Sequence, residues 1–381
     1  MKRAYICLLS TMLLMLPSFA LAADAEQIEN RIDKLEQKLE TLHSSQQEKD
    51  QKQADPLDTI SDRLTFSGLL EVEGIYESDY ADDASSDLEL ATLEFGVDAE
   101  IHDYVSSHVL FLYEEPTDEN VEVDEAVITL GNPEKFPIYL TAGRQYLPFG
   151  VYETAMVSDP LSLEIAESQE TAVQLRFEKE GAYGGVYAFN GDVDESSDSE
   201  NHIDNFGANV GYNLQTGDVS TDVSVSYLNN IGDSDTLGDT LEDQANSTIE
   251  DYVAGMAASG SMHYRGFNLI GEYIAALDEF QEDEIGFDGN GAQMSAWNAE
   301  LGYSFAVQGS EATVAAAYQG TDEALDLGLP KNRYMASISV GLFENNVSLS
   351  LEYAYDQDYD QDKGGTGDDA QTITTQLAMG F

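Results

Sequence analysis

Apolar and polar positions alternate with a period of two through most of the chain beyond residue 62. In one clear segment Leu93, Phe95 and Val97 face one way, while Glu94 and Asp98 face the other. Comparable segments recur about sixteen times, each roughly 9–12 residues long. Because successive side chains of a strand point to opposite faces, this pattern predicts an all-β fold whose strands are apolar on one face and polar on the other.

Two architectures can be built from such strands. In a soluble sandwich the apolar faces meet in a core, whereas in a membrane barrel they face lipid and the polar faces line a wet lumen. Charged residues such as Arg176 and Glu300 lie in mid-strand on polar faces, which a dry core would not tolerate. Tyrosines that suit an interfacial girdle end many of the apolar faces: Tyr113, Tyr227, Tyr303, Tyr318, Tyr353 and Tyr355. The sequence therefore predicts a transmembrane antiparallel β-barrel of about 16 strands over residues 63–381.

Charge enters at the connections between these segments. The chain carries a formal net charge of −57, and its acids cluster in Gly-rich runs that alternate with short links such as Phe343–Asn346. Long polar loops at one end and short turns at the other are typical of outer-membrane barrels. The acidity excludes a basic nucleic-acid surface. It could also reflect only the surface of an acidic secreted protein.

The first residues predict a secretory signal. Lys2 and Arg3 precede an apolar run that ends in Ala20-Leu21-Ala22, a small-x-small cleavage site, so we expect residues 1–22 to be removed. The one cysteine of the chain, Cys7, leaves with this segment, and the mature protein is then expected to have no disulfide and no thiol ligand.

Residues 23–53 predict a periplasmic coiled-coil helix, joined to the barrel by a polar linker at 54–62. The apolar positions are spaced 4, 3, 4 and 3 residues apart, which is a heptad seam formed by Ile28, Ile32, Leu35, Leu39 and Leu42. A lone helix of this length is marginal in water, so it should associate with sister chains or dock on its own barrel. We expect a homo-oligomer, and a trimer by comparison with outer-membrane porins in general.

The polar faces of the strands predict an acidic lumen. The acids expected to face it are Glu71, Glu73, Glu94, Asp98, Glu100, Asp222, Glu272, Glu300 and Glu352. Such a funnel would concentrate cations and repel free anions at low salt. The sequence therefore predicts a cation-preferring pore.

One segment of the barrel is more specific than the rest. It reads Gly143-Arg144-Gln145-Tyr146-Leu147-Pro148-Phe149-Gly150 and ends a strand at a Pro-Phe-Gly break, after which a long, less acidic stretch runs to Ser168. Such a stretch suits a loop that folds into the lumen as a constriction. We expect the constriction and solute-binding residues to be Arg144, Gln145, Tyr146, Pro148, Phe149 and Arg176. The two arginines could set a local field across the pore or form structural ion pairs.

No motif predicts an enzyme. The chain has no metalloprotease, nucleophile-elbow or phosphate-loop pattern in a suitable context, so no catalytic residue is assigned. The five histidines lack paired metal spacing, and we expect neither a cofactor nor a metal site. Asp358, Asp360 and Asp362 begin like a calcium loop, but Lys363 stands where the required glycine would be, so bound Ca²⁺ is only a weak expectation.

The signal, the short coiled coil and the GRQYLPFG segment together resemble the LbtU-type siderophore porins. More distantly they resemble the phosphate-selective O/P porins and the DcaP-like porins. The resemblance implies a bacterial outer-membrane protein that takes up an iron–siderophore complex or a similar small polar solute without TonB. It also implies that the terminal Phe381 is read by the barrel-assembly machinery, and that the partners are membrane lipid and lipopolysaccharide. The lumen lacks the lysines of a phosphate-selective porin.

Three functional hypotheses follow. The first is a porin or receptor for siderophore uptake, and the second is a general cation-preferring porin. The third is a non-transporting barrel whose acidic loops bind divalent cations or a partner at the cell surface. Single-channel conductance of the purified protein separates the first two from the third.

Overall fold

The computed structural model describes residues 63–115, 120–196 and 202–381. Residues Arg63–Phe381 form one compact unit. The expected signal peptide, coiled coil and linker all lie outside the described residues, so they stay predictions.

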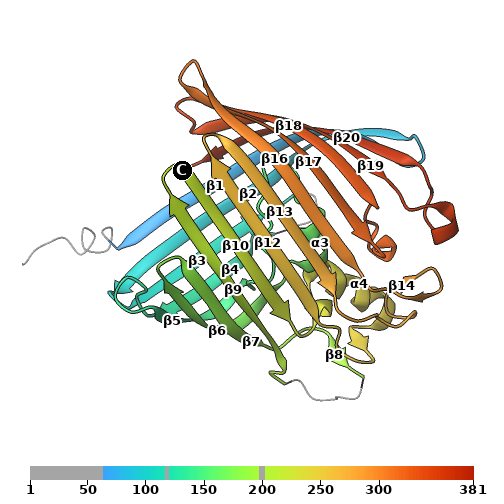
Figure 1. Cartoon of the computed structure of the whole chain (residues 1–381), viewed down its shortest axis with the longest axis horizontal. Coiled ribbons are helices and arrows are strands. Elements are labelled where there is room, and N and C mark those ends of the chain that lie inside the picture. The colour runs from blue at the N-terminus through green and yellow to red at the C-terminus, as the bar shows by residue number, and fades with distance from the viewer. Residues whose placement is uncertain (1–62, 116–119, 197–201) are drawn as a thin grey trace, which may run out of the picture. The chain divides into compact units, whose positions relative to one another are not determined.

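Antiparallel strands pair in sequence order and close into a single barrel (Figure 1). The strands of the barrel are β1 Leu64–Ser78, β2 Ala84–His102, β3 Val105–Tyr113, β4 Glu122–Leu130, β5 Ile138–Tyr146, β6 Gln169–Lys179, β7 Ala182–Phe189, β9 Asn205–Thr216, β10 Val219–Leu228, β12 Gly255–Tyr264, β13 Phe267–Ala276, β16 Ser295–Val307, β17 Ser310–Asp322, β18 Asn332–Leu342, β19 Val347–Gln357 and β20 Asp369–Gly380. The barrel closes where β1 pairs with β20, and the backbones of Gly68 and Phe381 exchange two hydrogen bonds of 3.1 Å. The prediction of a 16-stranded antiparallel barrel is confirmed.

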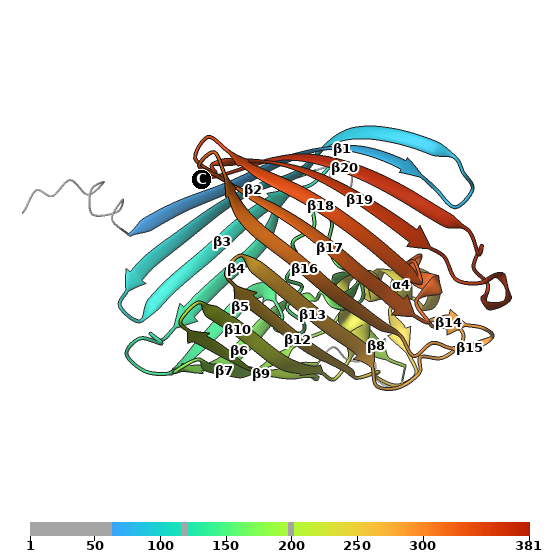
Figure 2. The ribbon, with the colours of Figure 1, turned by 45° about the horizontal axis from the view of Figure 1, so that its top comes forward.

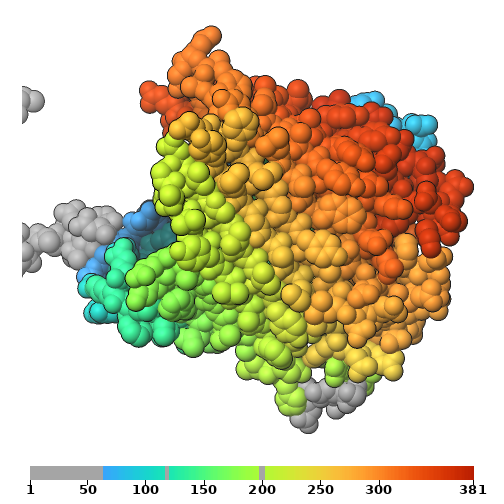
Figure 3. Space-filling view, viewed as in Figure 1, coloured from blue at the N-terminus to red at the C-terminus, as the bar shows by residue number. Residues whose placement is uncertain are grey.

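The barrel is polar inside and apolar outside. On β16, Asn298 and Glu300 face inward and are each 2% exposed, whereas the outward Leu301 is 56% exposed. On β19 the inward Glu352 is 2% exposed and the outward Leu351 is 49% exposed. Figure 3 shows the outer surface of this wall, from the green to the red segments, as continuous. This arrangement is the reverse of a soluble sandwich and is the one that lipid requires.

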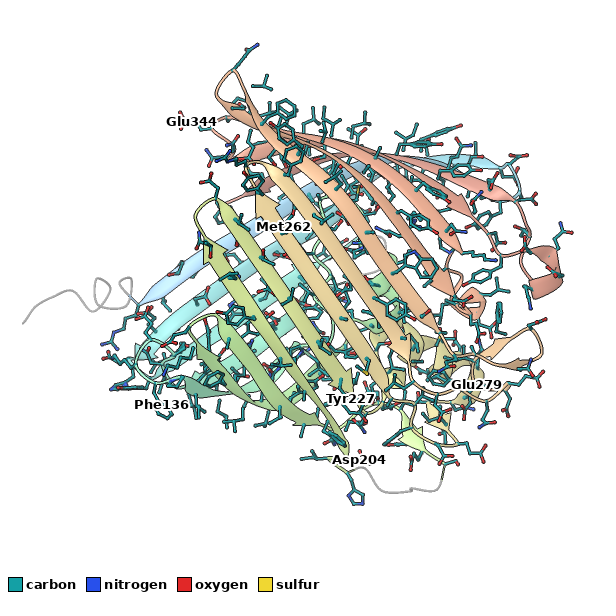
Figure 4. All side chains as sticks on the ribbon, in the orientation of Figure 1. Phe136, Asp204, Tyr227, Met262, Glu279 and Glu344 are labelled. Carbon is teal, nitrogen blue, oxygen red and sulfur yellow. The ribbon has the colours of Figure 1, made fainter. Side chains whose placement is uncertain are left out.

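The two ends of the barrel differ. Short turns join the strands at one end, where Phe136 and Glu344 lie, and long loops join them at the other, where Asp204 and Glu279 lie (Figure 4). We call these the turn end and the loop end. Both termini of the barrel lie at the turn end, since β1 begins there and β20 ends there (Figure 2).

The loops at the loop end are themselves folded. Their elements are α3 Leu161–Ala166, β8 Asp194–Glu195, η1 Ile231–Asp233, α4 Asp235–Ala245, β11 Thr248–Ile249, β14 Gly286–Phe287, β15 Asn290–Gly291, η2 Leu325–Leu327 and η3 Gln361–Lys363. Among the described residues, no helix is long and apolar enough to cross a membrane.

The largest apolar core lies among these loops and the inner wall beside them. Leu161 and Ile165 of α3 are fully buried, as are Leu237 and Leu241 of α4, and Phe149 is 1% exposed. The core therefore fills part of the barrel at its loop end, and it holds the β5–β6 loop against the loops that follow β10 and β13.

Candidate functional site

The site is built around the β5–β6 loop, residues 147–168, which we call the lumen loop. Gly143 precedes it with φ +140°, and a Cβ there would lie 1.9 Å from the carbonyl oxygen of Ala126 on β4. Gly150 turns the chain with φ +86°, a conformation that favours glycine. These two glycines of the GRQYLPFG segment let β5 lie close to β4 and let the loop turn into the barrel.

Glu272 on β13 anchors the first part of the lumen loop. Its Oε1 accepts a hydrogen bond of 2.7 Å from the backbone N–H of Val151, and its Oε2 accepts one of 3.3 Å from that of Tyr152. The hydroxyl of Ser162, further along the same loop, donates to Oε2 at 2.8 Å. Glu272 is only 6% exposed, so this inward carboxylate is covered by the loop that it holds.

Two more glutamates anchor the middle of the loop in the same way. Glu300 on β16 accepts from the hydroxyl of Thr154 at 2.7 Å and from the N–H of Ala155 at 2.8 Å. Glu352 on β19 accepts from the N–H of Val157 and from the hydroxyl of Ser158. We call Glu272, Glu300 and Glu352 the clamp glutamates.

The clamp glutamates have no basic partner among the described residues. A buried carboxylate without compensation is very unfavourable, so the N–H and O–H donors of the loop must supply that compensation. The carboxylate of each clamp glutamate therefore binds donors of the lumen loop. Glu272, Glu300 and Glu352 thus point into the barrel, but the lumen loop covers them, which the sequence does not predict.

The other predicted lumen acids divide by their partners. Asp222 on β10 accepts from the hydroxyl of Tyr183 on β7 at 2.6 Å, so it links strands of the barrel wall. Asp98 lies 2.8 Å from Nδ1 of His108, whose Nε2 lies 3.4 Å from Glu125. The inward acids of β1 and β2 form a group that we call the acid wall: Glu71, Glu73, Glu94, Asp98 and Glu100.

The lumen loop lies against one side of the barrel. Within the described residues, its hydrogen bonds to the barrel go only to strands from β10 to β19. At one end of this range the N–H of Gly150 donates to Ser226 on β10 at 3.1 Å, and at the other the loop donates to Glu352 on β19. Gln319 on β17 accepts from the N–H of Leu161 at 3.0 Å. Ser337 on β18 donates to the carbonyl of Ala155 at 3.1 Å. None of these hydrogen bonds reaches the acid wall on β1 and β2.

The GRQYLPFG side chains do not all reach the lumen. Arg144 and Tyr146 share the outward face of β5 with Ile138, which is 42% exposed. Arg144 donates to Gln169, and the hydroxyl of Tyr146 donates to Asp124 at 3.0 Å, near the loop end of β4 and β6. The expected lumen position of these two residues is therefore corrected, because the strand alternation turns them outward.

The remaining members of the segment do face inward. Gln145 is 6% exposed and donates to the carbonyl of Ala172 on β6 at 3.0 Å. Phe149 is buried in the loop-end core, and Pro148 beside it is partly buried. They shape the start of the lumen loop from within the wall.

Arg176 is the inward arginine of the expected pair. Its guanidinium lies 5.6 Å from the centre of the Tyr139 ring on β5. Within the described part of the chain it forms no ion pair, and its side chain is half-buried in the lumen wall of β6. Arg144 and Arg176 thus lie on opposite faces of the sheet and cannot form one ring of charge.

The lumen loop is also joined to the loop after β10. The N–H of Asp235, at the start of α4, donates to the carbonyl of Glu167 at 2.8 Å, and the hydroxyl of Ser234 donates to that of Ile165 at 2.8 Å. Desolvation and the neighbouring charge of Asp235 together raise the pKa of Glu167 to about 8. Desolvation likewise raises the pKa of Asp235 to about 6. Two acids with raised pKa values thus lie at the junction of the two loops.

No metal centre emerges. Over the ranges that the structure describes, no group of three His, Cys, Asp or Glu side chains could hold a metal ion. In the loop expected to resemble a calcium site, Asp358 accepts from the N–H and hydroxyl of Thr366 instead, both at 2.6 Å. The weak expectation of bound Ca²⁺ is not supported by this geometry.

Comparisons with curated proteins find relatives that are named UPF0422 proteins. No protein-family model matches the chain. A UPF0422 protein of Coxiella burnetii is 30% identical over 312 residues, which is 80% of this chain and 66% of that protein. A UPF0422 protein of Legionella pneumophila is 26% identical over 357 residues, again with 66% of its length covered. The chain thus spans just under two thirds of the length of the curated relatives it matches.

Solved structures of outer-membrane porins share the fold. An anion-selective porin from Comamonas acidovorans is 12% identical with a TM-score of 0.56, over 84% of this chain and 99% of that one. OmpF of Salmonella typhi, in complex with daunomycin, is 12% identical with a TM-score of 0.59, and DcaP of Acinetobacter baumannii is 14% identical with a TM-score of 0.53. Both matches cover 84% of this chain and 97% of the other. At these identities the likeness shows a porin-like barrel fold.

Proposed function

We propose that this protein is a passive outer-membrane channel that prefers cations among small polar solutes. The observation that carries the proposal is the lumen loop, which folds inside a closed barrel and is fastened to one side by the clamp glutamates. A loop held in this way narrows a pore, and none of its hydrogen bonds within the described residues reaches the acid wall of β1 and β2. The porin-like fold of the neighbours is consistent with this role.

Cation preference rests on the acid wall. Glu71, Glu94 and Glu100 face the lumen, and no basic residue of the described chain pairs with them. Rings or rows of carboxylates beside a narrow aqueous passage favour cations, and salt weakens this preference because exposed charges are screened over about 10 Å at 0.1 M. The inward Arg176 is a local exception that could meet an anionic group of a solute.

The test is a reversal potential measured across planar bilayers under a KCl gradient. The wild type should prefer K⁺ over Cl⁻, and the preference should fall as the salt concentration rises. The triple variant Glu71→Gln, Glu94→Gln, Glu100→Gln should lose most of it. A matched control is Asp278→Asn, Glu279→Gln, Glu282→Gln in the β13–β14 connection, which removes as many charges outside the lumen and should change the preference little.

Two results would count against the proposal. Anion preference in the wild type would contradict the role of the acid wall. No conductance at all would favour the alternative of a non-transporting barrel that presents acidic loops at the cell surface.

For the identity of the solute we propose a ferric siderophore, because the GRQYLPFG segment resembles that of the LbtU-type siderophore porins. A negatively charged passage does not favour an anionic ferric complex, so a neutral or cationic one fits the observed charges better. Uptake of radioactive ferric siderophore by cells that lack TonB, with and without this protein, tests the point. Equal uptake by both strains would remove the siderophore and leave the channel proposal intact.

A further inference from the structure

A hollow of about 610 Å³ lies between the lumen loop and the turn end of the barrel. Its roof is formed by Ala155, Met156 and Val157 of the lumen loop. Its wall is formed by residues of β9 to β20 and of the turns at 217–218 and 265–266, and most of these carry a hydroxyl or an amide. The volume is in the range of small-molecule sites in proteins.

Strand register sets the hydroxyls of this wall in a row. Ser304 lies opposite Thr313, Thr313 opposite Ser339, Ser339 opposite Ser350, and Ser350 opposite Gln376, so each of the strands β16 to β20 contributes one residue. The hydroxyls of Ser304 and Thr313 are 2.8 Å apart, and that of Ser350 donates to Ser339 at 3.0 Å. We call the four hydroxyl residues, together with the amide of Gln376 at the end, the hydroxyl row.

The hollow is almost neutral in a strongly acidic protein. The acid and the arginine at its edge, Asp218 and Arg265, pair with each other at 2.8 Å. His263, also at its edge, lies 3.3 Å from Glu153 of the lumen loop. The clamp glutamates are covered by the loop. The acid wall borders the hollow at one edge, where Gln376 of β20 donates to Glu73 at 2.8 Å. Away from this edge a charged solute finds no matched partner in the wall.

The wall also keeps hydrogen-bonding capacity in reserve. Each hydroxyl has one donor and two acceptor positions, so the bonds within the row leave some of them unused. Ser348 adds a hydroxyl for which the described chain provides no partner. Such hydroxyls are suited to a ligand that both donates and accepts.

We propose that this hollow is a binding site for an uncharged polyhydroxylated solute, such as a short sugar, on its way through the channel. Sugars present hydroxyls at their edges and apolar C–H groups on their faces, which match the hydroxyl row and the apolar roof of the lumen loop. Neighbouring strands are about 4.8 Å apart, so a solute can exchange one contact for the next along the row. Weak contacts at several positions allow both entry and exit.

This inference rests on the proposed channel function and names a solute class for it. The experiment measures swelling of liposomes that contain the purified full-length protein, with sucrose as the probe and tetraethylene glycol as an uncharged solute that has few hydroxyls. The wild type should admit sucrose faster than size alone predicts. The double variant Ser339→Ala, Ser348→Ala removes two partly exposed hydroxyls and should lower the sucrose rate about fivefold while leaving tetraethylene glycol unchanged.

Two further variants define the cause. Ser339→Thr with Ser348→Thr keeps both hydroxyls and should restore sucrose entry. Ser67→Ala with Ser106→Ala removes two inward hydroxyls from β1 and β3 and should leave both rates unchanged. KCl conductance, measured on the same preparations, should be the same in all variants.

The outcomes separate the two proposals. KCl conductance with equal sucrose rates in wild type and Ser339→Ala, Ser348→Ala would overturn the sugar site and leave the channel standing. A parallel loss of both solutes in that variant would also overturn it, because the effect would then be one of pore size. Absence of KCl conductance in the wild type would overturn both.

Discussion

Whether a charged side chain points into the barrel or out of it decides whether it can act on a solute in the lumen. Arg144 and Arg176 are arginines of neighbouring strands, yet Arg144 points outward and Arg176 inward. Arg144 lies on the outer face near the loop end and donates to Gln169, which in turn donates to Asp124. An inward arginine acts on every solute in the lumen. Their positive charge is the same, and the effect on permeation differs.

We predict that Arg176→Gln increases the cation preference of the channel, since it removes a positive charge that no described acid neutralises. Arg144→Gln is the matched control, and it should leave the reversal potential unchanged. Both are measured under the same KCl gradient. An equal effect of the two variants would contradict the assigned faces of β5 and β6.

The clamp glutamates make a second point at the residue scale. From the sequence, Glu272, Glu300 and Glu352 were indistinguishable from Glu94 or Asp98, because all five fall on polar strand faces. What separates them is the loop that reaches them, which is 110 to 195 residues away along the chain. Alternation predicts which face a side chain takes but carries no information on which distant segment covers it.

At the scale of elements, the lumen loop is a strap fixed at three positions. Replacement of Glu272 by Gln keeps the side-chain volume but removes an acceptor from the N–H groups of Val151 and Tyr152. A buried donor that loses its partner costs about 1–3 kcal/mol, so the first part of the loop should loosen. We predict a larger and noisier single-channel conductance for Glu272→Gln.

The control for this prediction is Asp222→Asn. Asp222 also faces the lumen, but its partners Tyr183 and Asn213 belong to neighbouring strands rather than to the loop. This variant should keep the conductance and the noise of the wild type. If Glu272→Gln behaves like Asp222→Asn, the loop is held by its apolar core alone.

The junction between the lumen loop and α4 should respond to pH. Desolvation, together with the charges of Asp235, Asp159, Asp124 and Glu164, raises the pKa of Glu167 to about 8. A raised pKa in the folded state means that the folded protein binds the proton more tightly than the unfolded chain does. The contribution to stability is thus fully present below the unfolded pKa, near 4.5, and is lost as pH rises through about 8.

We therefore predict that this junction is tighter at pH 6 than at pH 8.5. Hydrogen exchange of the α3 and α4 backbone, corrected for the intrinsic pH dependence, should show stronger protection at the lower pH. Glu167→Gln should abolish most of the difference. Unchanged protection across this range in the wild type would show that Glu167 ionises without affecting the contact between the two loops.

The elements also show how far the sequence reaches. The strands were predictable because the two-residue period is long and repeated, as on β16 and β19. The six-residue α3 was expected only as part of a loop, because so short a helix leaves no periodic signal and is formed by its packing on α4. The hydroxyl row was missed for another reason. Each serine is an ordinary polar position, and only the register between five strands brings them together.

At the scale of the whole barrel, the interior offers distinct surfaces. The clamp glutamates hold the lumen loop to β13, β16 and β19, and the hydroxyl row lies beneath it on β16 to β20. The acid wall of β1 and β2 adjoins this row where Gln376 donates to Glu73 at 2.8 Å. Cations and neutral solutes can thus find different surfaces in one lumen. This division follows from the register of the strands together with the length of a single loop.

The outer surface bears on assembly. Most of it is apolar, as lipid requires, but Asp124, Arg144, Tyr146 and Gln169 form a polar hydrogen-bonded cluster on the outward faces of β4 to β6. Asp124 is only 7% exposed. Charged groups on a lipid-facing wall are unfavourable except near the interface, so this cluster fits the barrel rim or a contact with a sister chain.

The predicted coiled coil lies outside the described residues, and we predict that it mediates association between copies of the chain. Its seam of Ile32, Leu35 and Leu39 has no apolar partner nearby in the sequence, and we predict that the seam buries itself between chains. Replacing these three residues by Ser should shift the native mass in detergent towards the monomer, while the barrel keeps its heat-modifiable mobility on gels. The control Glu29→Ser, Lys34→Ser, Glu36→Ser changes as many positions off the seam and should keep the oligomer. An unchanged mass in the seam variant would show that the seam does not hold the oligomer together. It would favour the alternative in which the helix docks on its own barrel.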